Sequence, residues 1–476
     1  MDLLGLTIKD LEEKLKRGDF SIHELIKACF TLIKDKDKKI NAYLTLNEEG
    51  AFKQADNYDN LIKKNKNIFD EKPLLGVPVA VKDLYTTKNI RTTAGSKIIK
   101  DYIPPFNATV VNKLINAGAI IIGKTNEDAW GHGSSGENTD YEPTKNPYDL
   151  SRVPGGSSSG SGAAVAYGSA LVGTGTDTGS SVRLPAGFCN LVGLKPTYGR
   201  VSRYGVIAMA SSFDTIGHMT RTVYDNAKVL EVTAGADPFD GTTVPVPIEK
   251  YSEGLEKPIK GLKIGLPKEY FIEGLDSRVG NSIKESIKIL KKLGATVSEV
   301  SLPHTDYAMA AYYILVPSEV SSNLSRYDGV RYGTTRDVFG AEAKRRIMLG
   351  SYTLSSGYYD AYYLKAAKVR TLIKQDFENA FDKVDMLVVP TSPTLPFKIG
   401  EKADDPLKMY LSDIFLCPVN LAGVPGLNIQ SGFVDGLPVG MQLIGPQFSE
   451  KLLYKVAYAY ERETEYYKVR PEFKNG

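Results

Sequence analysis

The sequence predicts an α/β protein with a largely parallel or mixed central β-sheet. Short apolar segments alternate with amphipathic segments of helical length along much of the 476 residues. Hydrophobic residues make up 42% of the chain and charged residues 24%, which is typical of a globular protein. Local patterns support this class from one end of the chain to the other.

The chain opens with helices. Thr7 caps a predicted helix over Ile8–Lys16, and Gly18 ends it. Ser21 and Glu24 have the spacing of a capping box, so a second helix is expected over Ile22–Lys34. A third, charged helix is expected over Ala51–Lys66. We therefore expect a helical segment over about residues 1–70.

Apolar strands then alternate with helices. The segment 74–83 is expected to be an interior strand that carries Lys82 at its mouth. Further units with the same order follow it. They are the helix Thr109–Ala117 with strand 119–124, the helix Ala163–Leu171 with strand Leu171–Thr176, and the strand Leu262–Gly265 with helix Val279–Leu293 and strand Thr296–Val300.

The last third begins with a helical, tyrosine-rich segment over about residues 308–385. Strands are expected again at Met386–Val389, Leu427–Gln430 and Gly440–Ile444, and a helix at Glu450–Glu463. We expect these strands to complete the same sheet, so that residues 1–476 form a single domain with the helical segments packed on it or within it.

Composition excludes several classes of protein. The 59 basic and 56 acidic residues are interspersed, so a strongly basic nucleic-acid footprint is absent. The three cysteines and four histidines form no CxxC or HExxH pattern, and we expect no metal site. No apolar run is long enough for a membrane helix, and the N-terminus has no signal-peptide core. We expect a cytoplasmic protein with no membrane partner.

One stretch, Arg152 to Arg183, differs in composition from the rest. It holds two Gly/Ser clusters, 155–160 and 176–181, joined by the apolar run 163–171. Glycine allows close approach of the backbone, and clustered N–H groups and hydroxyls stabilise an anion. A flexible linker would not enclose an apolar helical segment. The stretch is therefore a candidate site for a phosphate or for the oxyanion of acyl transfer.

Three kinds of chemistry fit such a stretch. A phosphate loop of the GxxxxGK[ST] type needs a lysine that neither cluster has. The residues Gly156 to Gly160 match GxSxG, with Ser158 as nucleophile and His218 or His304 as base, but no apolar strand precedes them. The third is a serine nucleophile served by a lysine that burial makes neutral. Lys82 fits that role, although from spacing alone a salt-bridged lysine is the better explanation, with Asp83 as one candidate partner.

Three motifs in order resemble the amidase signature family. They are GVPVAVKD (76–83), GGSSSGS (155–161) and DTGSSVR (177–183). The resemblance implies a Ser–cis-Ser–Lys triad of Ser181, Ser157 and Lys82. It also implies that family's fold, a central mixed β-sheet flanked on both faces by helices.

Later blocks are similar to one branch of this family, the A subunits of tRNA-dependent amidotransferases. These blocks are 193–205, 319–333, 344–357, 358–363 and 418–426, and the similarity extends from Leu4 to about Tyr467. It implies a glutaminase subunit that supplies ammonia to amidate Glu-tRNA(Gln), and in some cases Asp-tRNA(Asn). It implies B and C subunits as partners, no cofactor in this chain, and ATP with Mg²⁺ in the B subunit. The alternative is a stand-alone amidase for small or aryl amides.

The resemblance also assigns the other site residues. The backbone N–H groups of Thr178, Gly179 and Ser180, with that of Ser181, would form the oxyanion hole. An arginine fork suits the carboxylate of glutamine and a carboxylate suits its ammonium. By resemblance these are Arg346 and Asp413, with Tyr312 lining the pocket in preference to Tyr313. Asp177 and Arg183 are expected to position the loop.

Some positions depart from the family pattern. Ser180 and Asn190 stand where glycine is usual, and Ser180 is tolerable only with a negative φ. Ser159 and Gly162 differ from the usual run GGSSGGSA over 155–162, and His218 replaces a usual proline. The run 127–132, expected to line the approach to the site, also differs, and 334–338 is shorter than the pattern.

Overall fold

A single mixed sheet forms the centre of the protein, seen here in a computed structural model that describes residues 2–65, 67–271 and 274–472. Eleven strands of these residues have the order β1-β3-β2-β4-β6-β5-β10-β11-β9-β7-β8. They are β1 (Tyr43–Leu46), β2 (Pro78–Lys82), β3 (Ile120–Thr125), β4 (Val172–Asp177), β5 (Val192–Lys195), β6 (Thr215–Thr220), β7 (Lys263–Pro267), β8 (Thr296–Val300), β9 (Met386–Pro390), β10 (Gly426–Val434) and β11 (Leu437–Ile444).

Strand direction changes within the sheet. β2 runs parallel to β3 and β4, and β7 runs parallel to β8 and β9. The neighbours in the central run β4, β6, β5, β10, β11 and β9 are antiparallel to one another. The predicted α/β class with a mixed sheet is confirmed. β9, β10 and β11, from the last third of the chain, lie in the same sheet as β2 and β3.

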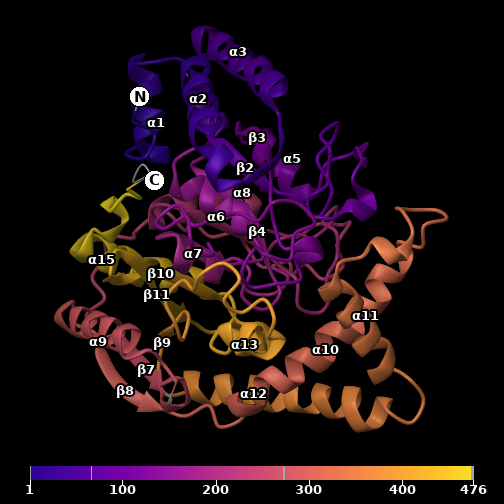
Figure 1. Ribbon diagram of the computed structural model, residues 1–476. Coiled ribbons are helices and arrows are strands. Elements are labelled where there is room, and N and C mark those ends of the chain that lie inside the picture. Colours follow the sequence, from indigo (N-terminus) through magenta and orange to yellow (C-terminus); the bar gives the residue numbers. More distant parts are fainter. Residues whose placement is uncertain (1, 66, 272–273, 473–476) are drawn as a thin grey trace.

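Helices surround this sheet (Figure 1). Within the described residues they are α1 (Ile8–Arg17), α2 (Ile22–Ile40), α3 (Glu48–Lys64), α4 (Ile68–Glu71), α5 (Thr109–Asn116), α6 (Ser159–Ala166), α7 (Arg183–Phe188), α8 (Val223–Thr233), α9 (Ser277–Lys292), α10 (Ala308–Asn323), α11 (Ala341–Thr353), α12 (Lys365–Phe381), α13 (Pro406–Tyr410), α14 (Cys417–Ala422) and α15 (Glu450–Thr464). In Figure 1, α10, α11 and α12 extend away from the sheet at lower right, and α1, α2 and α3 lie at the top.

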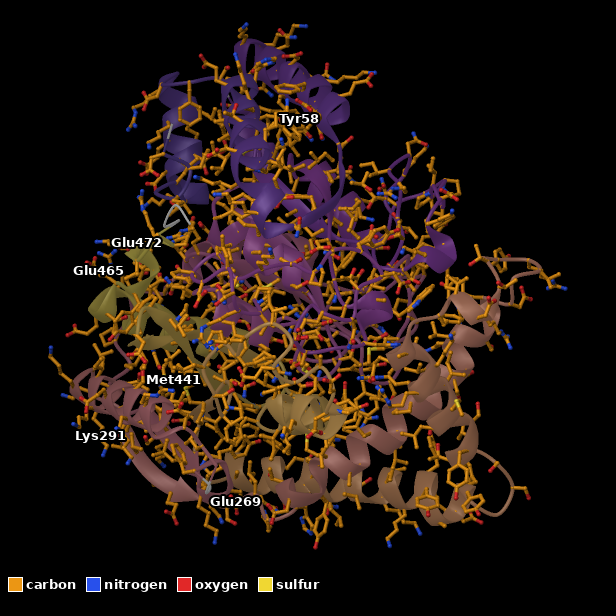
Figure 2. The ribbon with its side chains drawn as sticks, in the orientation of Figure 1. Tyr58, Glu269, Lys291, Met441, Glu465 and Glu472 are labelled. Carbon is orange, nitrogen blue, oxygen red and sulfur yellow. The ribbon has the colours of Figure 1, made fainter. Side chains whose placement is uncertain are left out.

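The sheet is covered on both faces. Gln430 of β10 donates to the carbonyl of Gly187 in α7, on the face that Asn428 shares. Ser431 hydrogen-bonds to Ser282 of α9 at 2.7 Å. On the neighbouring strand β11, a Cβ on Gly440 would meet the backbone of Gly187 in α7, whereas the adjacent Val439 packs in a cluster with Val279 of α9. Since neighbouring residues of a strand point to opposite faces, α7 and α9 cover different sides of the sheet. Figure 2 shows Met441 of β11 inside the molecule, where it is fully buried, and Lys291 at the exposed rim.

The elements expected from periodicity match the structure with shifts at their ends. The capping box of Ser21 and Glu24 is present at the start of α2. That helix continues to Ile40, six residues beyond its expected end, because the lysine-rich run forms a solvated helix end. The third helix ends at Lys64, and Lys66 lies outside the described residues.

One predicted helix is misplaced. The expected range is Ala163–Leu171, but α6 runs from Ser159 to Ala166 and so begins inside the first Gly/Ser cluster. The reason is packing: a Cβ on Gly160 would come within 2.3 Å of the Ala42 carbonyl oxygen. Such a close approach to neighbouring backbone requires the small residues that composition alone associates with loops.

No helix in the described ranges combines the length and apolar character needed to cross a bilayer.

Candidate active site

Lys82 occupies the carboxyl end of β2 and is fully buried. Its Nζ lies 2.7 Å from Ser157 Oγ, 3.0 Å from Ser158 Oγ and 3.0 Å from Thr176 Oγ1. Burial lowers the pKa of Lys82, although Glu127, Asp128 and Asp177 oppose that shift. The Lys82 side chain is therefore placed to accept a proton from Ser157.

Lys82 does form an ion pair, with Glu127 Oε2 at 3.5 Å from its Nζ, but the suggested partner Asp83 is wrong. Asp83 Oδ1 lies 3.3 Å from Nζ of another buried lysine, Lys124 of β3. Asp83 also accepts hydrogen bonds from the backbone and hydroxyl of Thr93. Lys82 is the last residue of β2 and Asp83 is the first residue beyond it, and the two side chains take different partners.

Ser157 and Ser181 belong to the two Gly/Ser clusters, whose backbones lie side by side near the end of β4. The peptide bond between Gly156 and Ser157 is cis. The backbone N–H of Ser158 donates to the carbonyl of Ser181 at 3.2 Å, which ties the clusters together. The Ser181 hydroxyl has no hydrogen-bond partner among the described residues, and the residue is 5% exposed. The structure thus joins Lys82 to Ser157 directly and brings Ser181 alongside them.

Residues 178–181 form a turn with free hydrogen-bond donors. Within the described chain, no acceptor takes a hydrogen bond from the backbone N–H of Thr178, Gly179, Ser180 or Ser181. Consecutive N–H groups of this kind form a concavity that binds an anion. Ser180 is not among the residues with positive φ, so serine is tolerated at this position. Asn190 does take a positive φ of 55°, a conformation that asparagine adopts more readily than most residues.

Asp177 and Arg183 fix this turn from behind. Arg183 is fully buried and donates through Nη2 to Asp177 Oδ1 at 2.8 Å and to the Gly179 carbonyl at 3.0 Å. Asn420 accepts from the same guanidinium and donates to Asp177. Burial alone would raise the pKa of Asp177, but its pairing with Arg183 lowers it. These buried contacts support a positioning function for both residues.

The turn is also held at its first residue. The Thr178 hydroxyl donates to Asp214 at 2.7 Å, and Asp214 accepts from the backbone N–H of Met209 and Ala210. Asp214 ends the segment 198–214, which leads from β5 toward β6. This segment therefore has to be rigid for Thr178 to be fixed.

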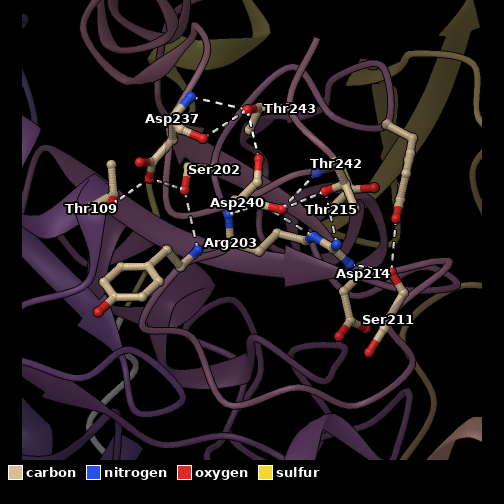
Figure 3. A network of polar contacts seen from close by, with 12 residues as sticks. Thr109, Ser202, Arg203, Ser211, Asp214, Thr215, Asp237, Asp240, Thr242 and Thr243 are labelled. Atoms are coloured by element: carbon tan, nitrogen blue, oxygen red, sulfur yellow. Dashed lines mark hydrogen bonds and ion pairs between the residues drawn. The ribbon is translucent and has the colours of Figure 1, made fainter.

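A network of polar contacts holds that segment (Figure 3). Asp237 accepts from the hydroxyls of Thr109 and Ser202 at 2.6 and 2.5 Å. Asp240 accepts from the backbone N–H of Arg203 at 2.8 Å and lies 3.6 Å from its guanidinium. The network fixes the start of the segment whose end holds Thr178.

The predicted glutamine-binding residues lie close to one another beside the turn. A Cβ built on Gly179 would lie 2.5 Å from the Tyr312 hydroxyl, so Tyr312 packs directly against the oxyanion turn. Tyr313 instead stacks on Tyr410 with ring centroids 3.8 Å apart. Tyr312, rather than Tyr313, faces the candidate oxyanion hole.

Arg346 and Asp413 are both 4% exposed. Arg346 donates through Nε to Glu342 at 2.7 Å, and its guanidinium lies over the rings of Tyr313 and Tyr410. Asp413 accepts from the Ser134 hydroxyl at 2.6 Å. Burial raises the pKa of Asp413 to about 6, although Ser134 and Ser180 oppose the shift. Its other oxygen, Oδ1, has no partner in the described structure, which leaves an acceptor for a cationic ligand.

Sequence reasoning missed several residues that shape the site. Ser134, Glu342 and Asn420 are buried and contact the predicted residues directly. Glu342 is four residues before Arg346 on α11, a spacing that signals a pair on one helix face. The others lack such a signal because their contacts join distant segments.

The two histidines considered as bases, His218 and His304, have partners outside the triad. His218 of β6 hydrogen-bonds to Thr233 of α8 at 2.9 Å, and burial lowers its pKa to about 3. His304 pairs with Asp376 at 2.9 Å. Neither ring hydrogen-bonds to Ser158 or Ser181 within the described residues, which disfavours the GxSxG interpretation.

The site thus contains a lysine hydrogen-bonded to a serine, next to a turn that carries a second serine and four free backbone N–H groups. We compared the chain with known proteins. The model of one family, described as Amidase, matches residues 24–454. The chain belongs to the amidase family. Similarity to individual members extends over the full length.

This amidase is 54% identical to the A subunit of the glutamyl-tRNA(Gln) amidotransferase of Carboxydothermus hydrogenoformans, covering 99% of this chain and 100% of that protein. It is 52% identical to the corresponding protein of Geobacillus kaustophilus, with the same coverage. The crystal structure of the corresponding protein from Thermotoga maritima superposes with a TM-score of 0.83 at 40% identity, over 97% of this chain and 95% of that one. A 6-aminohexanoate cyclic dimer hydrolase superposes with a TM-score of 0.89 at 25% identity, over 99% of each chain.

Proposed function

We propose that this amidase is the glutaminase subunit of a tRNA-dependent amidotransferase. The contact of Lys82 with Ser157, next to Ser181 and the free N–H groups of the turn 178–181, carries the proposal. Relatives at 52 and 54% identity that match over their whole length are the A subunits of glutamyl-tRNA(Gln) amidotransferases. They favour glutamine as the amide and an assembly as the working form.

The reaction starts with the Ser181 oxygen attacking the side-chain amide carbon of glutamine. As the new C–O bond forms, the Ser181 proton passes to Ser157, and the Ser157 proton passes to neutral Lys82. The amide oxygen becomes an oxyanion, and the N–H groups of Thr178, Gly179 and Ser180 donate to it, with that of Ser181.

The tetrahedral intermediate then loses ammonia. Lys82 returns its proton through Ser157 to the leaving nitrogen, and the C–N bond breaks to leave a glutamyl ester on Ser181. Water attacks this ester along the same proton path and releases glutamate. Each proton taken from a nucleophile is thus given back to a leaving group.

Glutamine is oriented by charge at its far end. We propose that Asp413 Oδ1 accepts from the α-ammonium group, and that the Arg346 guanidinium binds the α-carboxylate. Glu342 and the two stacked tyrosines hold the guanidinium plane in place. Tyr312 lies against Gly179, where it would line the glutamine site.

The ammonia would be used on a tRNA-bound carboxylate elsewhere. We propose that a B subunit uses ATP and Mg²⁺ to activate Glu-tRNA(Gln), or Asp-tRNA(Asn), and that a C subunit joins the assembly. This chain would need no cofactor and would work in the cytoplasm. An exposed aromatic surface on the projecting helices, where Tyr352, Tyr358 and Tyr359 are 40–48% exposed, supports contact with another protein.

The decisive experiment measures ammonia and glutamate release from glutamine by the purified chain. It is run alone and with candidate B and C subunits, charged tRNA and ATP. We expect low activity alone, a rise in the assembly, and loss in Ser181→Ala. Ser169→Ala, which removes a buried hydroxyl bonded to Tyr43 and the Ala164 carbonyl, is the matched control. Rapid hydrolysis of simple or aryl amides, indifferent to partners, would instead establish a stand-alone amidase.

A further inference from the structure

Glu127 is a buried carboxyl that the proposed reaction does not use. It follows β3 and is fully buried. Its Oε2 lies 3.5 Å from Lys82 Nζ, and neither of its oxygens has a hydrogen-bond partner in the described part of the chain. A buried carboxyl without donors is costly to the folded state, and an adjacent cation is what offsets that cost. Its position therefore points to a function tied to Lys82.

The hydroxyls around Lys82 do not distinguish its two protonation states. Ser157, Ser158 and Thr176 each carry a hydroxyl that can donate or accept. They satisfy an amine and an ammonium equally well. Within the described residues, Glu127 provides the one carboxylate within 4 Å of Nζ, so it is the group at this distance that favours the charged form.

The other titratable groups nearby have partners of their own. Asp83 pairs with Lys124, and Asp128 accepts from the backbone N–H groups of Gly136 and Asn138. Asp177 pairs with Arg183. The Tyr85 hydroxyl donates to the Gly175 carbonyl at 2.7 Å. Among these groups Glu127 is the one whose side chain makes no hydrogen bond in the described residues, and its ion pair is with Lys82.

We propose that Glu127 is a positioning residue for the base. Its carboxylate stabilises the ammonium that forms on Lys82 Nζ when the Ser181 proton arrives through Ser157. No bond forms to Glu127, and the proton leaves Lys82 again with the departing group. This inference rests on the proposed triad but not on glutamine as the substrate.

Electrostatics agree with this geometry. Burial raises the pKa of Glu127 to about 8, while Lys82 and Lys124 lower it and Asp83 raises it further. Burial lowers the pKa of Lys82, and Glu127 is the first of the carboxyl groups that oppose this shift. The two therefore titrate as a coupled pair. Removing the carboxylate takes away an attraction that favours charged Lys82, so Lys82 loses its proton at a lower pH. For any reaction that needs neutral Lys82, the acid limb of the pH–rate profile therefore moves to lower pH.

The test uses a fluorophosphonate probe on the full-length chain. Ser181 Oγ forms a bond to phosphorus, fluoride leaves, and the hydroxyl proton passes through Ser157 to Lys82. The second-order rate of labelling is measured from pH 5 to pH 10 for the parent chain, Glu127→Gln and Glu127→Met. Methionine is a second variant of similar length that fills an apolar space if glutamine impairs folding. Asp225→Asn is the control, since Asp225 of α8 is also buried but accepts from the backbone N–H of Ile8.

We expect the acid limb of both Glu127 variants to fall by about one pH unit or more, the effect of a close opposite charge. We expect the alkaline plateau rate to fall about tenfold, less than the 10²- to 10⁴-fold of a direct acid–base group. Asp225→Asn should keep the parent profile. An unchanged limb in a folded Glu127 variant that still labels at Ser181 overturns the inference.

The two proposals fail differently. Labelling at Ser181 with a shifted limb but no glutamine hydrolysis, even in the assembly, supports Glu127 and overturns the glutaminase proposal. No labelling at Ser181 in the folded parent chain overturns the triad and the Glu127 inference together.

Discussion

Lys82 becomes a candidate base because folding buries its side chain completely among three hydroxyl groups. In water a lysine is protonated near neutral pH and cannot accept a proton. Desolvation disfavours the ammonium and lowers its pKa. His218 is buried as well, but its ring hydrogen-bonds to Thr233 on α8 and, among the residues that the structure describes, to no serine of the site.

These two residues give a direct contrast. We expect Lys82→Ala to reduce kcat/KM for glutamine by about 10²- to 10⁴-fold, the contribution of a general base. We expect His218→Ala to keep most of the activity, because its contacts are structural. Steady-state ammonia release by folded protein, verified by circular dichroism and thermal melting, checks both. An inactive His218→Ala beside an active Lys82→Ala would favour the GxSxG mechanism with Ser158 as nucleophile.

Among the elements, the turn between β4 and α7 depends on contacts from outside itself. Arg183 and Asn420 hold it through Asp177, Asp214 holds Thr178, and Tyr312 packs on Gly179. The free N–H groups can converge on one oxyanion only while all of these contacts persist. We therefore expect a small added volume in the turn to misplace the N–H groups, with little effect on the stability of the protein.

A methyl group at Gly179 tests this sensitivity. A Cβ there would lie 2.5 Å from the Tyr312 hydroxyl and 2.8 Å from the ring carbon that bears it. We expect Gly179→Ala to lower kcat on the order of 10²-fold, the cost of one misplaced oxyanion donor. Gly241→Ala is the control, because nothing lies within 4 Å of its added methyl group. Equal kcat values for the two variants would mean that the turn adapts freely.

At the scale of the whole molecule, one sheet brings together functional residues that span much of the chain. Lys82 ends β2 and Asp177 ends β4, both in the first half of the sequence. Asp413 and Asn420 belong to the segment that leads into β10. Because β10 and β11 lie between β5 and β9, the C-terminal strands occupy the middle of the sheet. The proposal that residues 1–476 form a single domain follows from this order.

Truncation tests that proposal. Removing residues 386–476 deletes β9, β10, β11 and α15, which exposes the edge of β5 and detaches β7 and β8. We expect the truncated chain to aggregate without a cooperative thermal transition, since unpaired edges and buried apolar faces become exposed. Solubility, circular dichroism and calorimetry check this. A soluble fragment with a cooperative transition would mean that residues 1–385 fold independently.

Much of the fold was predictable where the local pattern was strong. The capping box of α2, the apolar strands β2 and β3, and the amphipathic α9 follow from residue spacing alone. β5 and β6 were not predicted. β5 has four residues, and β6 reads TIGHMT, in which glycine, histidine and threonine hide the apolar alternation. Tertiary pairing, rather than propensity, makes these segments strands.

The sequence by itself determined which chemistry was available: two serines in Gly/Ser clusters and a lysine at a strand end, with the α/β class and the family that these motifs indicate. The tertiary structure alone decided their partners. In the folded protein Asp83 pairs with Lys124, and Lys82 contacts Ser157 and Glu127. Tyr312, rather than Tyr313, packs against the oxyanion turn. The physical reason is that burial and through-space distance set the pKa and contacts of each side chain, and both depend on segments far away in the sequence.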